Sequence, residues 1–386
     1  MHDLSIEEVN DVEKFHSLKK AWNSLLEKSR DNNVFLTWEW LFTWWKHYGN
    51  NKTLKIIIIK ESDKIISIAP LMQSKYRIGF LNIEVIENIC SMNCDYSGVI
   101  LTERKDESVA ILLSYLGKIL VDDNIVLQIS HIPDSSEFLN VLQKQYPAIL
   151  NSLYIDERII TSCPYIELPT KWEEYFNGLS SNRRGILRRA LRSLQQNHKL
   201  ELKNNTHEES LREQLKVLFD LHRKRWQLRN IKSKFTETTA CEFYTDISEV
   251  FLRNNWLDFS FLNIDGKPAS VIWGFNYNGK FYYMTPTFDL AYSDHKVGNV
   301  HIMKSIEYAI QRGLSVYDFL KGDEEHKSHW TNCRVDNIQI VMVKKGLEGR
   351  YLLKLLQIQK RIENIQEHGL VGSYHQRMMS KKQQRN

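Results

Sequence analysis

A group of charged residues near the end of the chain has the composition of a catalytic loop. Asp318 lies in a short apolar run, and Asp323, Glu324 and Lys327 follow Gly322 closely. A carboxylate can accept a proton from a nucleophile, and an ammonium group can stabilise an oxyanion. Because loops after strands often carry working groups, this segment holds the best catalytic candidates. The alternative is that the same charges form salt bridges and a turn.

Two histidines in this segment raise the question of a metal. His326 and His329 stand three positions apart, which could place two ligands on one face of a helix. The sequence shows no third ligand in pattern with them, and the five cysteines contain no CxxC pair. Ordinary surface histidines are the preferred interpretation, and we expect no metal.

Arginines are concentrated in a predicted helix over residues 172–192. Arg184, Arg188 and Arg192 recur every four residues, so they share one helical face. Stacked like charges repel unless an anion compensates them, which indicates a phosphate or an anionic substrate group. A solvated face paired with glutamates explains them equally well. Arg225 and Trp226 form a second candidate pair that could stack on a planar ligand.

The segment 292–299 could bind an anion at the start of a helix. It precedes a predicted helix over 300–312, and helix N-termini bind phosphates through free N–H groups and the helix dipole. A single glycine is weak support, so an ordinary surface loop remains an alternative. The candidate ligands here are His295, Lys296, Val297, Gly298 and Asn299.

Composition limits the class of protein. The chain has 386 residues, enough for two domains, and a mild net charge of +5 that does not by itself indicate nucleic acid. The acidic N-terminal segment does not resemble a signal peptide, and no apolar run approaches the length of a membrane span. With an odd number of scattered cysteines, a reduced cytoplasmic setting fits best, and no DNA partner is expected.

The order of predicted elements indicates an α/β protein of α+β layers in two parts. Residues 1–165 combine two N-terminal helices with short strands, a further helix and a strand. Residues 166–346 contain two long helices, an antiparallel meander with tight turns, a helix and two strands. Residues 347–386 read as a terminal helix and a basic tail. The tryptophans of 37–45 recur at helical spacing and are expected to face the core.

Several motifs carry a resemblance to a known family. The stretch FLTWEWLFTWWKHY (35–48), the dipeptide Pro70-Leu71 and the tetrapeptide CDYS (94–97) lie in the first half. SNRR (181–184) and YDFLKGDEEHK (317–327) lie in the second. Over residues 10–345 the chain resembles the cellulose-biosynthesis-type acetyltransferases, a double-GNAT group related to Fem-type peptidyltransferases. This resemblance implies two GNAT-like domains with mixed sheets flanked by helices, the first degenerate.

The resemblance also implies an activity. An acyltransferase would move an acetyl or small acyl group from acyl-CoA to an amine or hydroxyl, possibly on a sugar or polysaccharide precursor. The pyrophosphate would lie at 295–299, and the pantetheine would pair with the strand edge at Tyr283, Met284 and Thr285. Catalysis would fall to residues of the charged block and the strand, namely Asp323, Lys327, Glu324, Asp318 and Tyr283.

Two other functions are compatible with the sequence. A Fem-type enzyme would use aminoacyl-tRNA, and the arginines could meet tRNA phosphates. The sequence shows no long coiled-coil hairpin, a feature that many Fem-type enzymes carry. An inactive protein that binds a glycan or a nucleotide-sugar is the other alternative. Binding of CoA would discriminate among them.

Overall fold

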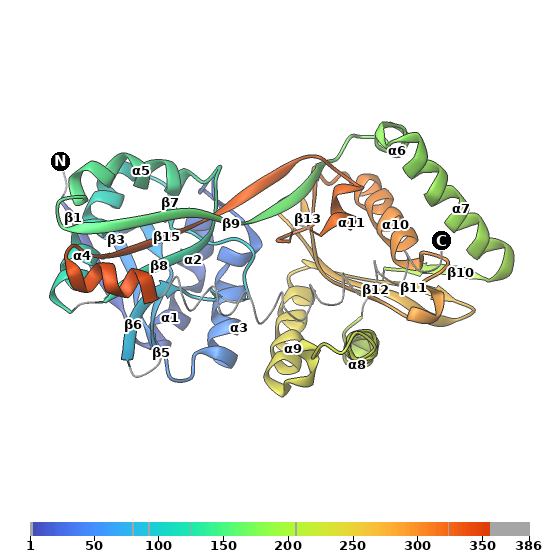
Figure 1. Cartoon of the computed structure of the whole chain (residues 1–386), viewed down its shortest axis with the longest axis horizontal. Helices are drawn as coiled ribbons and strands as arrows, with labels where there is room; N and C mark the ends of the chain where they lie inside the picture. The colour runs from blue at the N-terminus through green and yellow to red at the C-terminus, as the bar shows by residue number, and fades with distance from the viewer. Residues whose placement is uncertain are drawn as a thin grey trace.

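The computed structural model describes residues 3–78, 81–91, 93–123, 125–204, 207–322 and 324–355. Figure 1 shows two halves, each with strands flanked by helices, connected by long strands that pass between them. This arrangement confirms the predicted α/β class of mixed sheets flanked by helices. Within the ranges given above, no helix is both long and apolar enough to cross a lipid bilayer.

The first half contains helices and strands in alternating groups. Its helices are α1 (Val12–Ser17), α2 (Lys19–Leu26), η1 (Val34–Leu36), α3 (Trp38–Tyr48), α4 (Lys105–Asp122) and α5 (Glu137–Ile149). Its strands are β1 (Leu4–Val9), β2 (Thr53–Leu54), β3 (Ile56–Glu61), β4 (Lys64–Ala69), β5 (Leu71–Ile78), β6 (Leu81–Asn88), β7 (Ile100–Leu101), β8 (Val126–Pro133) and β9 (Leu153–Glu167).

The second half contains the predicted meander and its helices. The helices are α6 (Trp172–Gly178), α7 (Ser181–Asn197), α8 (Glu208–Gln227), η2 (Lys234–Thr236), α9 (Thr238–Arg253), η3 (Leu290–Tyr292), α10 (Val297–Gln311) and α11 (Glu325–Ser328). The strands are β10 (Leu200–Lys203), β11 (Leu257–Ile264), β12 (Lys267–Tyr277), β13 (Lys280–Phe288), β14 (Val316–Asp318) and β15 (Arg334–Lys344). Residues 347–355 are helical; the rest of the predicted terminal helix and the basic tail lie outside the described residues.

The two halves share one sheet. In the described chain it has eleven strands, in the order β10-β11-β12-β13-β14-β9-β15-β8-β6-β5-β2, beside a separate sheet β1-β3-β4-β7. Strand β9 pairs with β15 along most of its length and with β14 at its end. The expected boundary at Cys163-Pro164 therefore lies inside a continuous strand. Strand β15, which follows the second half in sequence, pairs with β8 of the first half.

The helices of the second half cover both faces of its sheet. Figure 1 shows α8 and α9 on one face, with α6, α7 and α10 on the other. Tyr282 packs into the α9-side core, whereas Tyr283 packs with Ile302 and Ile306 of α10. Successive residues of β13 thus point to opposite faces, as a strand requires.

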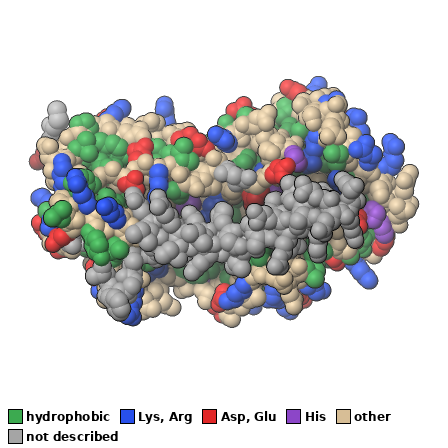
Figure 2. Space-filling view, viewed as in Figure 1, with side chains coloured by type: hydrophobic (Ala, Val, Ile, Leu, Met, Phe, Trp, Pro, Cys, Tyr) green, Lys and Arg blue, Asp and Glu red, His purple; other side chains and the backbone are tan. Residues whose placement is uncertain are grey.

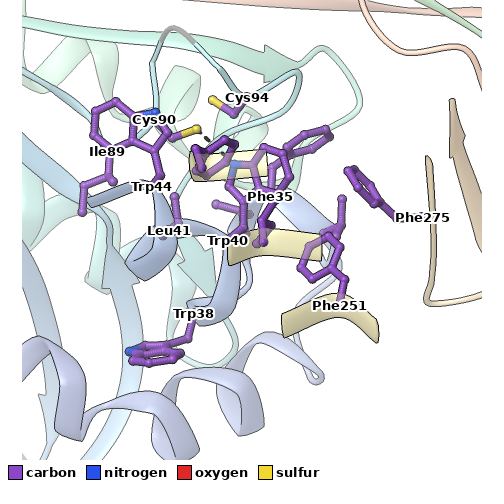
Figure 3. Packing of buried hydrophobic residues seen from close by; sticks show 14 of the residues in the cluster. Phe35, Trp38, Trp40, Leu41, Trp44, Ile89, Cys90, Cys94, Phe251 and Phe275 are labelled. Atoms are coloured by element: carbon purple, nitrogen blue, oxygen red, sulfur yellow. Dashed lines mark hydrogen bonds between the residues drawn. The ribbon is translucent and has the colours of Figure 1, made fainter. Parts of the chain in front are cut away.

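The tryptophan-rich helix α3 joins the two halves through an apolar core. Trp40 is fully buried, and its ring lies 6.0 Å from Phe251 and 5.6 Å from Phe275 of the second half. Its indole N–H donates to the Cys90 sulfur at 3.0 Å (Figure 3). Trp38, Trp44 and Trp45 are buried as well, so the expectation that this helix faces the core is confirmed.

One predicted helix is two. The helix expected over 172–192 breaks between α6 and α7, where Leu179 and Ser180 are extended. The Ser180 side chain accepts from the N–H of Arg183 in the first turn of α7 and so caps this helix. Arg184 donates to the Leu179 carbonyl. A serine N-cap can begin a helix inside a run of good helix formers. Helices α5 and α9 and strand β5 were not anticipated.

Candidate functional site

Strands β13 and β14 form a fork in the second half. They pair in parallel only over Lys280–Tyr282. Beyond that point the chain after β14 follows β9 instead, since Phe319 N–H donates to Pro164 O at 2.9 Å and Gly322 N–H to Ser162 O at 3.0 Å. Within the described chain, the β14-facing edge of β13 is therefore unpaired from Tyr283 onward. An extended ligand could pair with such an edge.

A β-bulge lies directly at the fork. Two residues of β13, Tyr283 and Met284, stand opposite Gly274 alone, between the pairs Phe275–Tyr282 and Trp273–Thr285. A Cβ on Gly274 would come within 2.5 Å of the Tyr282 carbonyl, so glycine is required for this close approach. Bulges re-aim side chains next to active sites, and this one turns the edge of β13 at the predicted donor residues.

The start of α10 is open to an anion. Lys296 caps the helix with φ of 54°, no side chain caps it, and its first turn contains no acidic residue. The positive φ at this helix start belongs to Lys296 and not to Gly298. Gly298 lies within the helix, where its Cβ would stand 3.1 Å from the Phe288 ring. His295 contacts the Ser193 hydroxyl at 3.2 Å.

A cavity of about 880 Å³ lies beside this helix start. Its lining comes from the end of β9, from α6, from the starts of α7 and α10 and from the segment around α11. It includes Lys296, Asn299 and His326, together with the carboxylates of Glu167 and Glu174. Arg183 also lines it, although only 8% exposed. The guanidinium lies 4.2 Å from the Trp330 ring and 3.4 Å from the Asn299 side-chain oxygen. Two helix N-termini and a buried arginine thus converge on one space.

Arg183 carries unsatisfied hydrogen-bonding capacity. Its Nε and the indole N–H of Trp330 are buried and have no hydrogen-bond partner within the described chain. Burial lowers the pKa of Arg183, but a guanidinium remains charged at neutral pH. An anion entering the cavity would satisfy these donors. Spacing alone did not identify Arg183, because its direction depends on the Ser180 cap three residues earlier.

The arginines singled out by spacing lie outside this cavity. Arg184 donates to the Asn177 carbonyl at 2.7 Å, and the exposed Arg188 lies 5.1 Å from the Phe176 ring. Arg192 is exposed, and Figure 2 shows basic side chains over this part of the surface. Their role in binding a substrate stays a prediction.

The second candidate pair, Arg225 and Trp226, lies in α8, and Arg225 contacts the end of β13. Arg225 stacks 4.1 Å from the Phe288 ring and reaches the Pro286 carbonyl at 3.5 Å. Burial lowers its pKa to about 10, which still leaves it charged at neutral pH. Trp226 stacks on His222 at 5.5 Å instead of presenting a free face on that side.

The charged block closes around the end of β14. Lys327 is buried, and its ammonium donates to the Lys321 carbonyl at 2.8 Å and the Leu320 carbonyl at 3.3 Å. It also pairs with Glu324 at 2.9 Å. Burial acts to raise the pKa of Glu324, but the charge and the hydrogen bond of Lys327, with smaller contributions from a backbone hydrogen bond and His326, together hold that pKa below its ordinary value. Asp323 lies outside the described residues.

Asp318 and Tyr283 are buried on either side of the fork. Asp318 accepts from the Tyr96 hydroxyl of the first half at 2.8 Å and from Leu320 N–H at 2.8 Å. Burial raises the pKa of Asp318 to about 6. The Tyr283 ring lies 5.6 Å from Phe319, and burial raises the pKa of its hydroxyl. The sequence left the direction of Asp318 open; it points to the interface between the halves.

The histidines of the block line the cavity without forming a metal cluster. His326 and His329 both contribute to its wall. Across the described ranges, no three His, Cys, Asp or Glu side chains are grouped to hold a metal ion.

Comparison with known proteins finds a family model that matches part of the second half. Residues 181–328 match the family model described as an acetyltransferase (GNAT) domain. This segment contains the fork, the start of α10 and the charged block up to Ser328. A search of curated proteins finds no match.

Solved structures share the fold of the whole chain. The crystal structure of FemX superposes with a TM-score of 0.59 at 10% identity, covering 87% of this chain and 96% of that one. L-PGS from Bacillus licheniformis gives a TM-score of 0.52 at 8% identity, covering 92% and 98%. Identities this low establish the fold alone. The resemblance to the cellulose-biosynthesis-type group stays a prediction.

Proposed function

We propose that this protein transfers an acetyl or other small acyl group from acyl-CoA to an amine or hydroxyl. The observation that carries the proposal is the fork between β13 and β14, which leaves a bulged strand edge unpaired beside the open start of α10. The GNAT match over 181–328 supports the reaction class. The domain limits 1–165, 166–346 and 347–386 belong to the same proposal, with the donor in the second domain.

The donor would occupy the cavity side of the fork. Its pyrophosphate would meet the N–H groups of Val297 and Gly298 and the charge of Lys296, while Arg183 would supply the unsatisfied Nε. The pantetheine amides would pair with β13 near Tyr283 and Thr285, as an added strand does. No described acidic side chain lies in the first turn of α10 to compete for this place.

The charged block would stabilise the tetrahedral intermediate of acyl transfer at the tip of the fork. Lys327 is held near the end of β14 by two backbone carbonyls, so its ammonium is fixed in position. A fixed positive charge can stabilise the oxyanion of a tetrahedral intermediate. Tyr283, with its hydroxyl protonated at neutral pH, is proposed as the acid toward the thiolate. Asp323, Glu324 and Asp318 are the carboxylate candidates for the base.

The acceptor is proposed to be an amine or hydroxyl on a sugar or polysaccharide precursor in the cytoplasm. The unpaired state of all five cysteines suits a reducing compartment. Arg184, Arg188 and Arg192 are the proposed contacts for an anionic part of a substrate, with Arg225 and Trp226 as the second group. Transfer from aminoacyl-tRNA remains the alternative reaction, and it would not require CoA.

Binding of CoA tests this proposal directly. The melting temperature and calorimetric titration of the full chain are measured with CoA and acetyl-CoA. We expect stabilisation that grows with ligand concentration, because a ligand that binds only the folded state raises its stability. Arg183→Gln should weaken binding about 10- to 150-fold, since it removes a charge-assisted contact worth about 1.5–3 kcal/mol.

The matched control is Arg189→Gln on the same helix, at an exposed position outside the cavity. This variant should bind CoA as the wild type does. No binding of CoA or acetyl-CoA by the folded wild-type protein would reject the proposed donor. Equal affinity of the Arg183→Gln variant would remove the cavity from the donor site.

A further inference from the structure

Lys234 places its ammonium group among buried hydroxyls, on the face of the sheet opposite the cavity. Its Nζ donates to Thr285 Oγ1 at 2.9 Å and to the Tyr244 hydroxyl, and these two oxygens are 2.9 Å apart. Tyr244 and Thr285 are each 3% exposed, whereas the Lys234 residue as a whole is solvent accessible. The head group therefore reaches inward while a path to solvent remains.

This lysine has no carboxylate partner. Among the described residues, no acidic side chain lies within ion-pair distance of it, and its contacts are neutral hydroxyls and the Phe235 and Tyr244 rings. A lysine held among neutral groups is not a stability device, because ordering a buried ammonium costs more than such contacts return. Buried lysines of this kind serve as bases, since they lose a proton readily.

Burial is the main influence on the titration of Lys234. It lowers the pKa of Lys234 to about 7, although the Asp95 charge acts to raise this pKa; the Lys321 charge has a smaller lowering effect. The other titratable groups that face it are Tyr244, and His222, whose own pKa is lowered by burial and by the Lys234 charge. Near pH 7 a substantial fraction of Lys234 is thus a neutral amine.

Position connects Lys234 to the donor site. Thr285, its partner, directly follows the two bulge residues of β13, at the edge proposed to pair with the pantetheine. Of the carboxylates proposed for the base, the two that the structure describes already have partners. Glu324 is ion-paired with Lys327, and both oxygens of Asp318 accept hydrogen bonds.

We propose that Lys234, positioned by Tyr244 and Thr285, is the group that accepts the proton of the acceptor nucleophile. This inference rests on the proposed acyltransferase function and adds the direction of approach. The donor lies on the α10 face of the fork, and the acceptor enters from the α8 and α9 face, where η2 carries Lys234.

The proton balance of the step is complete. The neutral Lys234 amine takes the proton from the acceptor O–H or N–H as that oxygen or nitrogen bonds to the thioester carbonyl carbon. The carbon–sulfur bond then breaks, and the CoA thiolate is protonated at the expense of the Lys234 ammonium, through Tyr283 or water. The products are the acylated acceptor and free CoA, and Lys234 is neutral again.

A kinetic test uses acetyl-CoA with hydroxylamine as the acceptor. Hydroxylamine is uncharged from about pH 7 upward, so changes of rate above that pH report groups on the protein. The wild-type rate should rise as the pH passes through about 7, the pKa of Lys234. Lys234→Arg keeps the charge and the donors but cannot lose its proton, so it should reduce the rate about 10²-fold and abolish the rise.

The matched control is Lys232→Met on the same loop. Lys232 is exposed and pairs with Glu237, so its loss should leave rate and pH profile unchanged. A Lys234→Arg variant with the wild-type rate and pH profile would overturn the inference. Glu324→Gln, by contrast, should keep the rise near pH 7; if the rise vanishes there instead, Glu324 is the base and Lys234 is not.

A labelling test does not depend on turnover. The wild-type protein is acetylated with trace acetic anhydride at a series of pH values, and the peptide that carries Lys234 is quantified by mass spectrometry. Labelling should have its midpoint near pH 7 and should slow when CoA is bound. A midpoint near pH 10, or a rate indifferent to bound CoA, would overturn the inference while the donor site stands. Failure of the protein to bind CoA would reject the donor site, and this inference with it.

Discussion

The two halves of the molecule repeat one arrangement with different endings. In the first, β6 and β8 pair in parallel and α4 crosses between them; in the second, β13 and β14 pair in parallel and α10 crosses between them. Both crossover helices follow a basic residue with positive φ, Arg104 at 43° and Lys296 at 54°. Short helices, η1 and η2, precede α3 and α9 in the same order.

The starts of the two crossover helices differ in charge. The first turn of α4 contains Asp106 and Glu107, and Arg104 pairs with Glu107 and with Glu61. Acidic side chains at a helix N-terminus already complement its dipole. The first turn of α10 has no acidic residue. The first half therefore satisfies its helix start internally, and the second leaves the same place available to a ligand.

The strand pairs differ in the same sense. Beyond the β6–β8 ladder, the Asn88 side chain accepts from Ser130 N–H at 3.0 Å and so bridges the two strands. Beyond the β13–β14 ladder the strands separate. In the first half, the Asn88 side chain bridges the two parallel strands beyond their ladder. In the second half, β13 is bulged at the corresponding place and its edge stays unpaired in the described chain. This difference supports a structural role for the first half and a donor site in the second.

The largest effect on turnover should come from a substitution in the loop that follows β14. Lys327→Met removes the fixed ammonium beside β14, whereas β8 is followed by a serine-capped helix with no such lysine. Removing one electrostatic contact to an oxyanion costs about 10²–10³ in rate, so turnover of acetyl-CoA with hydroxylamine should fall about 10²-fold. The melting temperature and CoA affinity are measured in parallel.

The Glu324→Gln variant tests the Lys327–Glu324 ion pair separately from the charge of Lys327. It removes the partner of Lys327 but leaves the ammonium on its two carbonyls, so turnover should fall less than tenfold. A Lys327→Met variant within about threefold of the wild-type rate, about 0.65 kcal/mol in barrier, would make this loop structural.

Giving the first turn of α10 a negative charge, like that of α4, should weaken binding of the donor. Asn299→Asp gives α10 an acidic first turn like that of α4, next to Arg183 at 3.4 Å. The new carboxylate would repel the pyrophosphate and pair with Arg183, so CoA affinity measured by calorimetry should fall at least about tenfold. Stability should not fall, because an acid at this place is worth about 0.3–1 kcal/mol.

The reciprocal control is Asp106→Asn in α4. It should leave CoA affinity unchanged and reduce stability by no more than about 1 kcal/mol. If Asn299→Asp binds CoA as tightly as the wild type does, the start of α10 does not hold the pyrophosphate.

Removal of the bridge in the first half should affect stability alone. Asn88 is 1% exposed, and Asn88→Ala would leave the Ser130 N–H buried without its acceptor. An unsatisfied buried group costs about 1–3 kcal/mol, which urea unfolding can measure. CoA affinity should be unaltered in the folded variant. A marked loss of CoA binding there would mean that the first half takes part in the donor site.

Local patterns predicted much of the fold. The meander β11–β13 follows from strand-forming runs separated by Asp265-Gly266 and Asn278-Gly279, and all four turn residues have positive φ. The position of β15 could not be predicted in the same way. Its pairing with β8 depends on contacts made across the whole chain, and its apolar pattern would suit either half.

The site shows the same division between local and long-range information. The start of this helix was predicted at residue 300 and is observed at Val297, because a helix start has a local signature. Binding of an anion there stays a prediction. Asp318 was named, but its partner Tyr96 lies 222 positions away in sequence. Lys234 was not named, since nothing in its neighbours indicates that Thr285 and Tyr244 will meet it. Its signal lies in the packing of η2 on α8 and α9, which lets the Lys234 side chain reach Thr285 of β13.

The smallest expected effect concerns the last residue pair of the two parallel ladders. In the β13–β14 ladder this pair is Tyr282 and Asp318, and in the β6–β8 ladder it is Glu87 and Gln128. Asp318→Asn therefore removes the ionisable group from β14 at the position where β8 carries the neutral Gln128. The amide oxygen can still accept from Leu320 N–H, and the amide NH2 can donate to the Tyr96 hydroxyl, which can also accept, so the fold should persist.

The sign of the pH effect follows from the direction of the pKa shift. Burial raises the pKa of Asp318 from an ordinary value near 3.8 to about 6, so between these values the folded state binds a proton that the unfolded state has lost. Stability contributed by this group must then fall as the pH rises from about 4 to about 6, by an amount on the order of 1–3 kcal/mol. Urea unfolding of the wild type and of Asp318→Asn from pH 4.5 to 7.5 isolates the group, because Asp258, whose pKa burial also raises, is common to both proteins. The difference in unfolding free energy should shift in favour of the variant as the pH rises. A difference that is constant across this range would show that Asp318 is ionised throughout, and β14 would then hold a permanent charge at the position where β8 holds the neutral Gln128.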